Sequence, residues 1–264
     1  MSRQLPVYQI DAFTDRLFGG NPAAVCPLES WLPDETMQAV ATENNLSETA
    51  FFVARNGGGE YDLRWFTPAA EVDLCGHATL ASAHLVLRNL APELDSVRFH
   101  TASGPLEVSR DGDLLVMDFP ARPPEARDVP EGFADAIGLA PSEMWSATKN
   151  MAVFETSAQV RELAPNLDYI AGLDKDGLIC TAPGDDCDFV SRYFAPHVGI
   201  PEDPVTGSAH CTTVPFWAER LGKSKLHARQ ISARGGELFC EMTGERVRMA
   251  GHAVLFMSGT IDLP

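Results

Sequence analysis

One carboxylate in the first half of the chain stands out because of the residues around it. Glu48 lies in the segment NNLSETAFF, where a predicted helix ends and an apolar strand begins. The apolar residues 50–53 are typical of a protein core, so Glu48 is expected at the edge of that core. Partial burial favours the protonated form of a carboxyl group, and such a group can give and take a proton near neutral pH. The alternative is a glutamate that caps the helix end or lies exposed at the strand edge.

Two loops that each lead into a predicted helix through a glycine carry further candidates. The first reads Cys75-Gly76-His77, and the second reads Thr206-Gly207-Ser208. The first-turn N–H groups of a helix have no helical partner and lie at the positive end of its dipole, so a substrate carboxylate could bind there without a nearby Lys or Arg. We therefore predict that Cys75, Gly76, Gly207 and Ser208 contribute to substrate binding. Alternatively, the glycines only allow tight strand-to-helix turns.

The same two loops place titratable side chains at the helix starts. His77 would present a neutral imidazole at the first helix start, unless it only caps the helix, because the positive dipole disfavours its charged form. Asp203 precedes the second helix, where it could orient a substrate amine or hydroxyl or only begin a turn before a proline. Cys75 lies where thiolates are stabilised. No metal site is expected, because no other Cys or His cluster supplies the remaining ligands at a recognisable spacing.

The elements that must position these residues fall into two similar halves. RWFTP at residues 64–68 and RYFAP at residues 192–196 share one pattern and are offset by 192 − 64 = 128 residues. Each is followed by a short loop, a glycine and a helix of buried character. We interpret this as an internal duplication. It predicts a first half at residues 1–118 and a second half at residues 119–264, with a last strand that can pair with either.

Apolar periodicity and turn residues predict the individual elements. The helix over residues 77–88 is apolar or small nearly all round, which is typical of a helix inside a core. A hairpin is expected over residues 48–66 and a three-stranded meander over residues 97–119. In the second half the pattern predicts one helix around residues 160–170 and another from about residue 208, which Pro215 would interrupt.

Composition excludes several classes of function. The 264 residues include 20 Lys+Arg and 37 Asp+Glu, a net charge of −17 that disfavours nucleic-acid binding. No apolar stretch reaches the roughly 20 residues of a membrane span, and no signal peptide is recognisable, so a cytoplasmic location is expected. Six scattered cysteines argue against a disulfide framework. No glycine-rich nucleotide loop is present, which agrees with an enzyme that needs no cofactor.

Four motifs together resemble a known family. IDAFTDRLFGGNPAAV, NNLSETAFFV, RWFTPAAEVDLCGHATLASAH and GIPEDPVTGSAHC are similar to the PhzF-like, or phenazine biosynthesis-like, family of the diaminopimelate-epimerase-like superfamily. The resemblance covers essentially the whole chain. It implies an α+β fold of two pseudo-symmetric domains, each a curved mixed β-sheet wrapped around a central helix, with the active site between them. A homodimer is also expected.

The resemblance implies roles for particular residues. The family's characterised member is a cofactor-independent isomerase in which a glutamate shuttles a proton, and the matching residue is Glu48. By the same matching, His77 and Asp203 are site residues, and Ser208 matches the site serine. The related epimerases use one cysteine per half, whereas this chain has Cys75 in the first half and Thr206 in the second. The two-thiol mechanism is therefore not expected to operate as it does there.

Three functions follow from these observations. The leading one is a cofactor-free isomerase or epimerase that moves a proton on a small carboxylate-bearing metabolite, with Glu48 as acid and base. The second is an amino- or imino-acid racemase or dehydratase that uses Cys75. The third is a non-catalytic protein that binds an acidic metabolite. The family's next residue after its site histidine is a proline, whereas this chain has Ala78, so the substrate stays open.

Overall fold

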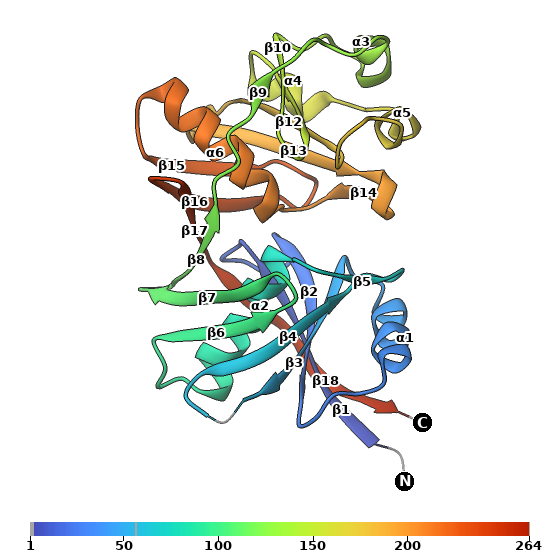
Figure 1. Ribbon diagram of the computed structural model, residues 1–264, viewed down its shortest axis with the longest axis vertical. Coiled ribbons are helices and arrows are strands. Elements are labelled where there is room, and N and C mark those ends of the chain that lie inside the picture. Colours follow the sequence, from blue (N-terminus) through green and yellow to red (C-terminus); the bar gives the residue numbers. More distant parts are fainter. Residues whose placement is uncertain (1–2, 56, 264) are drawn as a thin grey trace. The chain divides into compact units, whose positions relative to one another are not determined.

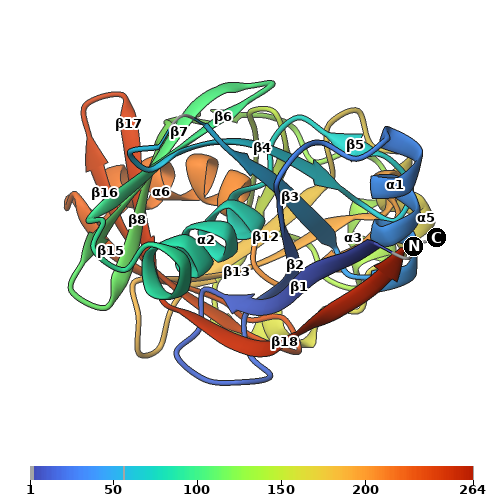
Figure 2. The same ribbon diagram turned by 90° about the horizontal axis from the view of Figure 1, so that it is seen from below.

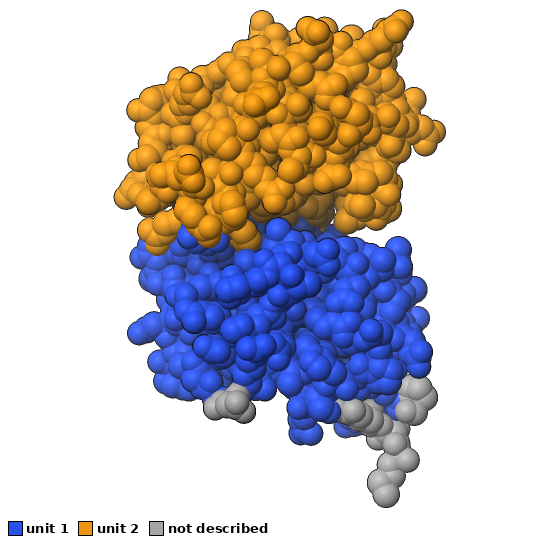
Figure 3. All heavy atoms as spheres, viewed as in Figure 1, with its two compact units in different colours: residues 1–118, 250–264 blue, residues 119–249 orange. Residues whose placement is uncertain are grey.

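The computed structural model describes residues 3–55 and 57–263 of the chain. It divides into two compact units of similar size (Figure 3). Unit 1 comprises residues 1–118 and 250–264, and unit 2 comprises residues 119–249. Among the described residues, no helix is long and apolar enough to cross a membrane.

Unit 1 is a mixed sheet that curves around one helix (Figures 1 and 2). The last strand, whose partner the sequence left open, pairs antiparallel with the first strand along its whole length, so the end of the chain belongs to this unit. The strands of unit 1 are β1 (Arg3–Ala12), β2 (Asn21–Leu28), β3 (Glu48–Ala54), β4 (Glu60–Phe66), β5 (Glu71–Val72), β6 (Ser96–Thr101), β7 (Gly104–Asp111), β8 (Leu114–Pro120) and β18 (Ala253–Leu263).

Unit 2 is also built from parallel and antiparallel strand pairs, and its long helix lies between its sixth and seventh strands in chain order. Strands β8 and β17 each reach across the division between the units. The strands of unit 2 are β9 (Glu125–Ala126), β10 (Glu143–Ser146), β11 (Asn150–Val153), β12 (Leu178–Pro183), β13 (Phe189–Ala195), β14 (Ile200–Asp203), β15 (Lys225–Gln230), β16 (Gly236–Thr243) and β17 (Arg246–Gly251).

The same order of strand pairing recurs in both units. In unit 1, β2 pairs in parallel with β3, β3 antiparallel with β4, and β4 in parallel with β6. In unit 2, β11, β12, β13 and β15 repeat this order of parallel, antiparallel and parallel pairs. The α+β class and the architecture of two similar curved sheets predicted for the chain are thus confirmed.

The helices of the two repeats correspond only in part. In unit 1, α1 (Asp34–Asn44) joins β2 to β3, and α2 (Gly76–Leu85) continues into the π-helical turn η1 (Val86–Leu90) before β6. In unit 2, the helices are α3 (Phe133–Ile137), α4 (Ser157–Glu162), α5 (Leu167–Ala171), the 3₁₀ turn η2 (Pro196–Val198) and α6 (Gly207–Leu221).

Helix α2 is buried along almost its whole length, as its small and apolar residues predict. It packs against β1, β2, β3 and β18, and Figure 2 shows it lying along these strands. Its serine and threonine hydroxyls are satisfied locally, because Thr79 Oγ1 donates to the Cys75 carbonyl and Ser82 Oγ to the Ala78 carbonyl. The helix can therefore carry polar residues inside the core.

Helix α6 is the corresponding helix of unit 2, and the predicted interruption at Pro215 is wrong. The helix continues through Pro215 to Leu221. A proline frees the carbonyl four residues earlier, which here belongs to Cys211. That carbonyl accepts a hydrogen bond of 2.8 Å from the Arg122 backbone N–H, so the released acceptor is satisfied from outside the helix.

The single helix predicted around residues 160–170 is also wrong, because two short helices occupy this region. Helix α4 begins with a capping box at Thr156 and Gln159 and ends at Glu162. Pro165 lies in the gap, and Asn166 caps α5 by accepting from the N–H groups of Asp168 and Tyr169. A proline followed by a good N-cap residue starts a new helix and does not extend the old one.

Candidate active site

Glu48 is the first residue of β3 and lies at the edge of the unit 1 core. Asn45, which closes α1, has the left-handed φ of 49° that ends the helix and turns the chain toward the strand. Glu48 lies opposite Ala23 of the parallel strand β2. Its side chain is only 12% exposed, so the glutamate is neither a helix cap nor an open strand-edge residue.

Cys75 and His77 flank the start of α2. Cys75 is the N-cap residue and has an extended backbone, with φ −142° and ψ 112°. Two residues later, His77 lies in the first turn with its side chain 5% exposed. The backbone turn at Gly76 therefore brings the Cys75 thiol close to the His77 imidazole.

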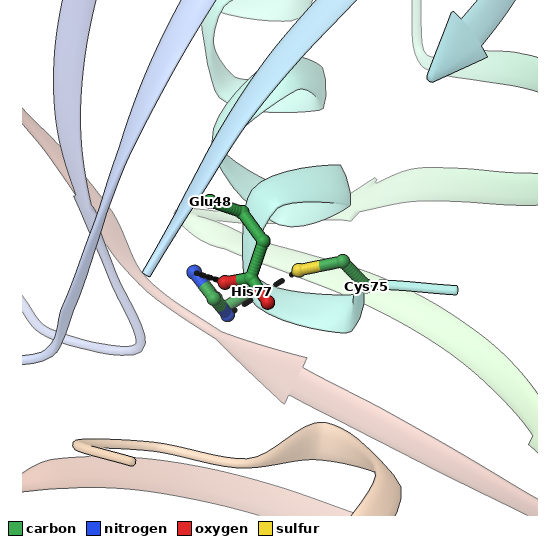
Figure 4. Close-up of side chains that lie close together, drawn as sticks. All are labelled: Glu48, Cys75 and His77. Carbon is green, nitrogen blue, oxygen red and sulfur yellow. Dashed lines mark hydrogen bonds and ion pairs between the residues drawn. The ribbon is translucent and has the colours of Figure 1, made fainter. Parts of the chain in front are cut away.

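The side chains of Glu48, Cys75 and His77 meet in one cluster (Figure 4). His77 Nε2 lies 3.2 Å from Glu48 Oε2, although the two atoms are not aligned as a hydrogen bond. On the other side of the ring, Nδ1 lies 3.5 Å from Cys75 Sγ and 3.2 Å from Asn21 Nδ2. The imidazole thus stands between a carboxylate and a thiol.

His77 is neutral at physiological pH. Burial lowers the pKa of its imidazole from 6.5 to about 3, because the charged ring would lose its water. A neutral ring carries one N–H, and the other nitrogen accepts. Since the amide of Asn21 and the thiol of Cys75 can both donate to Nδ1, we assign the proton to Nε2, which faces Glu48. The contact between Glu48 and His77 is therefore not an ion pair at neutral pH.

The cluster also bears on metal binding. Glu48, Cys75 and His77 each offer one ligand atom, and these atoms lie within 4.8 Å of one another. A thiolate, an imidazole and a carboxylate are all ligand types that zinc binds in proteins, and a zinc ion usually takes four ligands. The sequence prediction of no metal site overlooked Glu48, because this third donor lies 27 residues before Cys75.

In unit 2, Asp203 ends β14 and contacts the start of α6. Its Oδ2 accepts a short hydrogen bond from Thr206 Oγ1, and its backbone carbonyl accepts from Gln230 Nε2 at 2.7 Å. Gln230 also accepts from the Thr206 N–H at 2.8 Å. Thr206 occupies the place that Cys75 has in unit 1, so the second thiol position holds a hydroxyl engaged with a carboxylate.

Gly207 and Ser208 form the first turn of α6, as predicted. Gly207 is buried, and Ser208 is partly exposed while the rest of that turn is not. His210, one turn later, lies 2.8 Å from the Thr206 carbonyl, so its Nδ1–H donates there. Ser208 is therefore the side chain of this turn that a small molecule can reach.

The structure brings the predicted residues together in two groups. Glu48, Cys75, Gly76 and His77 lie in unit 1, and Asp203, Gly207 and Ser208 lie in unit 2. The sequence missed Asn21 and Gln230, which hold His77 and Thr206. Asn21 had one signal, its position between a glycine pair and a buried strand, whereas Gln230 had none, because it ends a strand that holds several other polar residues.

Comparison with known proteins gives one consistent result. The family model for the phenazine biosynthesis-like proteins matches residues 10–259. A Pseudomonas aeruginosa protein described as an uncharacterized isomerase is 51% identical over 98% of this chain and 100% of its own. The crystal structure of a PhzF-family protein from Enterococcus faecalis has a TM-score of 0.96 and 43% identity, covering 99% of this chain and 100% of its own.

The fold extends beyond these relatives. The structure of a predicted epimerase from Pseudomonas aeruginosa has a TM-score of 0.74 at 21% identity, covering 97% of this chain and 99% of its own. At this identity the similarity concerns the fold alone.

Proposed function

The chain belongs to the phenazine biosynthesis-like family, and from this premise we propose that it is a cofactor-independent isomerase that moves a proton on a small carboxylate-bearing metabolite. Relatives over its full length are named isomerases, which supports the reaction class. We further propose that Glu48 is the general acid and base.

The observation that carries this assignment is the neutral imidazole beside a mostly buried carboxylate. An imidazolium at 3.2 Å would hold Glu48 ionised, whereas neutral His77 can offer an N–H without adding a charge. Glu48 can then take a proton from a substrate carbon in its carboxylate form and return it in its acid form. The electron pair left on the substrate moves into the adjacent unsaturated system, so no external oxidant or reductant is needed.

The other residues receive binding roles in this proposal. His77 and Asp203 position the substrate, and Ser208 binds its acid group together with the N–H groups at Gly76 and Gly207. Helix starts favour anions because their N–H groups and dipole both point outward. Thr206 Oγ1 already donates to Asp203, which supports a binding role and not a proton-transfer role for this loop.

A racemase or dehydratase that uses Cys75 is the second candidate, and one observation favours it. Cys75 Sγ lies 3.5 Å from His77 Nδ1, so the neutral ring can hold the thiol in place by accepting from it. Cys75 would then be a second proton-exchanging group on the opposite side of the ring from Glu48. A protein that only binds an acidic metabolite is the remaining alternative.

The experiment is a thermal-shift screen of cyclic and amino carboxylic acids, followed by incubation of the hits with enzyme in D₂O. Deuterium at a carbon position, detected by NMR or mass spectrometry, supports an enzyme. Stabilisation without exchange in any hit contradicts the proposal and favours the binding protein. The chirality of the exchanged product then separates the isomerase from the racemase.

We also propose that the enzyme is cytoplasmic and, as the family resemblance suggests, a homodimer. Light scattering is expected to give twice the 28.6 kDa of one chain at micromolar concentration. A mass of one chain at high micromolar concentration would contradict the dimer.

A further inference from the structure

Unit 2 contains a buried lysine that the predicted site does not use. The chain has four lysines, and Lys175, Lys223 and Lys225 are exposed. Lys149 is only 8% exposed. It lies in the turn between β10 and β11, which is fixed by backbone hydrogen bonds from Ala147 N–H to the Lys149 carbonyl and from Asp176 N–H to the Thr148 carbonyl.

The ammonium group of Lys149 lies over an aromatic ring next to Asp203. Its Nζ is 5.2 Å from the centroid of the Tyr193 ring. Tyr193 of β13 is directly opposite Asp203 of β14, so their side chains share one face of the sheet. The Tyr193 hydroxyl is engaged elsewhere, because it donates to the Asp176 carbonyl at 2.7 Å. The lysine thus lies on the side of the sheet that carries the predicted site residue.

Within the described residues, no carboxylate forms an ion pair with this ammonium. Lys149 Nζ makes neither a side-chain hydrogen bond nor an ion pair there. Nor is Nζ among the fully enclosed polar atoms of that part of the chain. Many other cationic side chains of this acidic protein do have a carboxylate partner, for example Arg127, Arg192 and Arg229.

The surroundings act on the charge of Lys149 in opposing directions. Burial lowers the pKa of its ammonium, and Arg122 adds to this effect, whereas Asp176 and Asp203 oppose it. Arg122 is exposed, and its backbone N–H is fixed on the Cys211 carbonyl of α6. A buried cation that lacks an ion-pair partner is unfavourable unless an anion binds to it.

We propose that Lys149 binds the anionic group of an acidic metabolite in unit 2. This inference rests on the proposed function and deepens it, because it adds a side-chain cation to the main-chain N–H groups expected to hold the substrate's acid group. The shared ligand chemistry is a compact oxyanion, either a carboxylate or a phosphate. A lysine suits both, because its ammonium is a point charge without a fixed fork geometry.

The direct test follows the lysine signals by NMR in the full chain. Protein labelled with ¹³C at lysine Cε is titrated separately with cyclohexanecarboxylate and with inorganic phosphate, and the Lys149 signal is assigned from its absence in Lys149→Arg. We expect this signal alone to shift saturably with one probe, and its apparent pKa to rise. The probe that saturates it identifies the anion class. Four signals drifting together, or a Lys149 signal that neither probe moves, would overturn the proposal.

Variants provide a second readout by calorimetry with the same probe. We expect Lys149→Met to weaken binding at least tenfold, Lys149→Arg to keep it within about threefold, and the control Lys175→Met to leave it unchanged. Equal binding by Lys149→Met would overturn the proposal. If Lys149→Met does not fold, the wild-type titration still decides. Glu48→Gln is expected to bind the probe normally, so a failure of the Glu48 assignment would leave this result unaffected.

Discussion

A carboxylate, an imidazole and a thiol within contact of one another determine what unit 1 can do chemically. His77 is central, because its two nitrogens face Glu48 and Cys75 separately. Its neutrality follows from burial, and Asn21 fixes which nitrogen accepts. The ring therefore orients two groups that could each exchange protons, without taking a charge itself.

This arrangement predicts the effect of replacing the ring. His77→Asn keeps a polar group near Asn21 but removes the contact with Glu48. We expect turnover to fall about tenfold to hundredfold, as for misplaced reacting groups. Steady-state kinetics on a substrate from the screen would show whether the loss lies in kcat or in KM. A normal kcat would mean that His77 does not position Glu48.

Sequence reasoning found the residues of this cluster but not their contacts. Glu48, Cys75 and His77 were each identified from local motifs, and family resemblance placed them in a site. The distance from Glu48 to His77 depends on the register of β2 with β3 and on how α2 packs behind them. Such long-range pairing has no local signal, which is also why Asn21 and Gln230 were missed.

At the scale of secondary-structure elements, two arginines at repeated positions hold the short strands in place. Arg64 of β4 forms a two-pronged contact with Glu71 of β5, and Arg192 of β13 forms the same contact with Glu202 of β14. The second pair lies deeper. Arg192 also donates to the carbonyls of Val160, Arg161 and Leu163, and so caps the end of α4.

The two arginines form a matched pair for a stability experiment. We expect Arg192→Lys to lower the free energy of unfolding by roughly 2–4 kcal/mol. A lysine cannot form the two-pronged contact of the guanidinium and leaves buried acceptors unsatisfied. Arg64→Lys should cost less than about 1 kcal/mol, because its partners Asp34 and Glu71 are largely exposed. Urea unfolding measures both. Equal losses of unfolding free energy in the two variants would contradict the claim that burial makes the Arg192 contacts the stronger ones.

Helices and strands could be predicted from the sequence where the pattern of apolar and turn residues was complete. The apolar residues of α2 and the glycine turn between β3 and β4 gave the right structures. The two errors both concern proline. Pro215 is tolerated because Arg122 supplies the missing hydrogen bond from a distant segment, whereas Pro165 separates two helices that periodicity alone joined.

For the whole molecule, buried neutral histidines link stability to pH. Burial lowers the pKa of His77 to about 3 and that of His210 to about 4 from an ordinary 6.5. At neutral pH these rings are mostly unprotonated in both the folded and the unfolded state. Below pH 6.5 the unfolded state takes up protons that the folded state cannot, so stability falls as the pH drops toward 4.

We expect the free energy of unfolding to be roughly 2–4 kcal/mol lower at pH 5 than at pH 7 from these two rings together. Urea unfolding at pH 7, 6 and 5 tests this. The variant His210→Gln should be less stable at pH 7 but should lose less on acidification, because its unfolding takes up about one proton fewer. An unchanged pH dependence in this variant would rule out His210 as a source.

The duplicated architecture gives two loops of the same kind, but these loops carry different residues. Repeating strand pairs place a helix start at the same point of each unit, with Cys75 at one and Thr206 at the other. Because Thr206 is bound to Asp203, we propose that Glu48 of unit 1 carries the acid–base chemistry and that the Thr206 loop of unit 2 has a binding role. Glu48 is therefore the residue on which the account depends most.

The most direct test measures deuterium incorporation from D₂O into a substrate by wild type, Glu48→Gln and Cys75→Ser. Glu48→Gln keeps the shape of the side chain but removes the transferable proton, so exchange should fall by roughly 10²–10⁴-fold while substrate binding persists. Cys75→Ser should retain most of the exchange. If Cys75→Ser abolishes exchange and Glu48→Gln leaves it intact, the thiol is the base and the assignment of Glu48 is wrong.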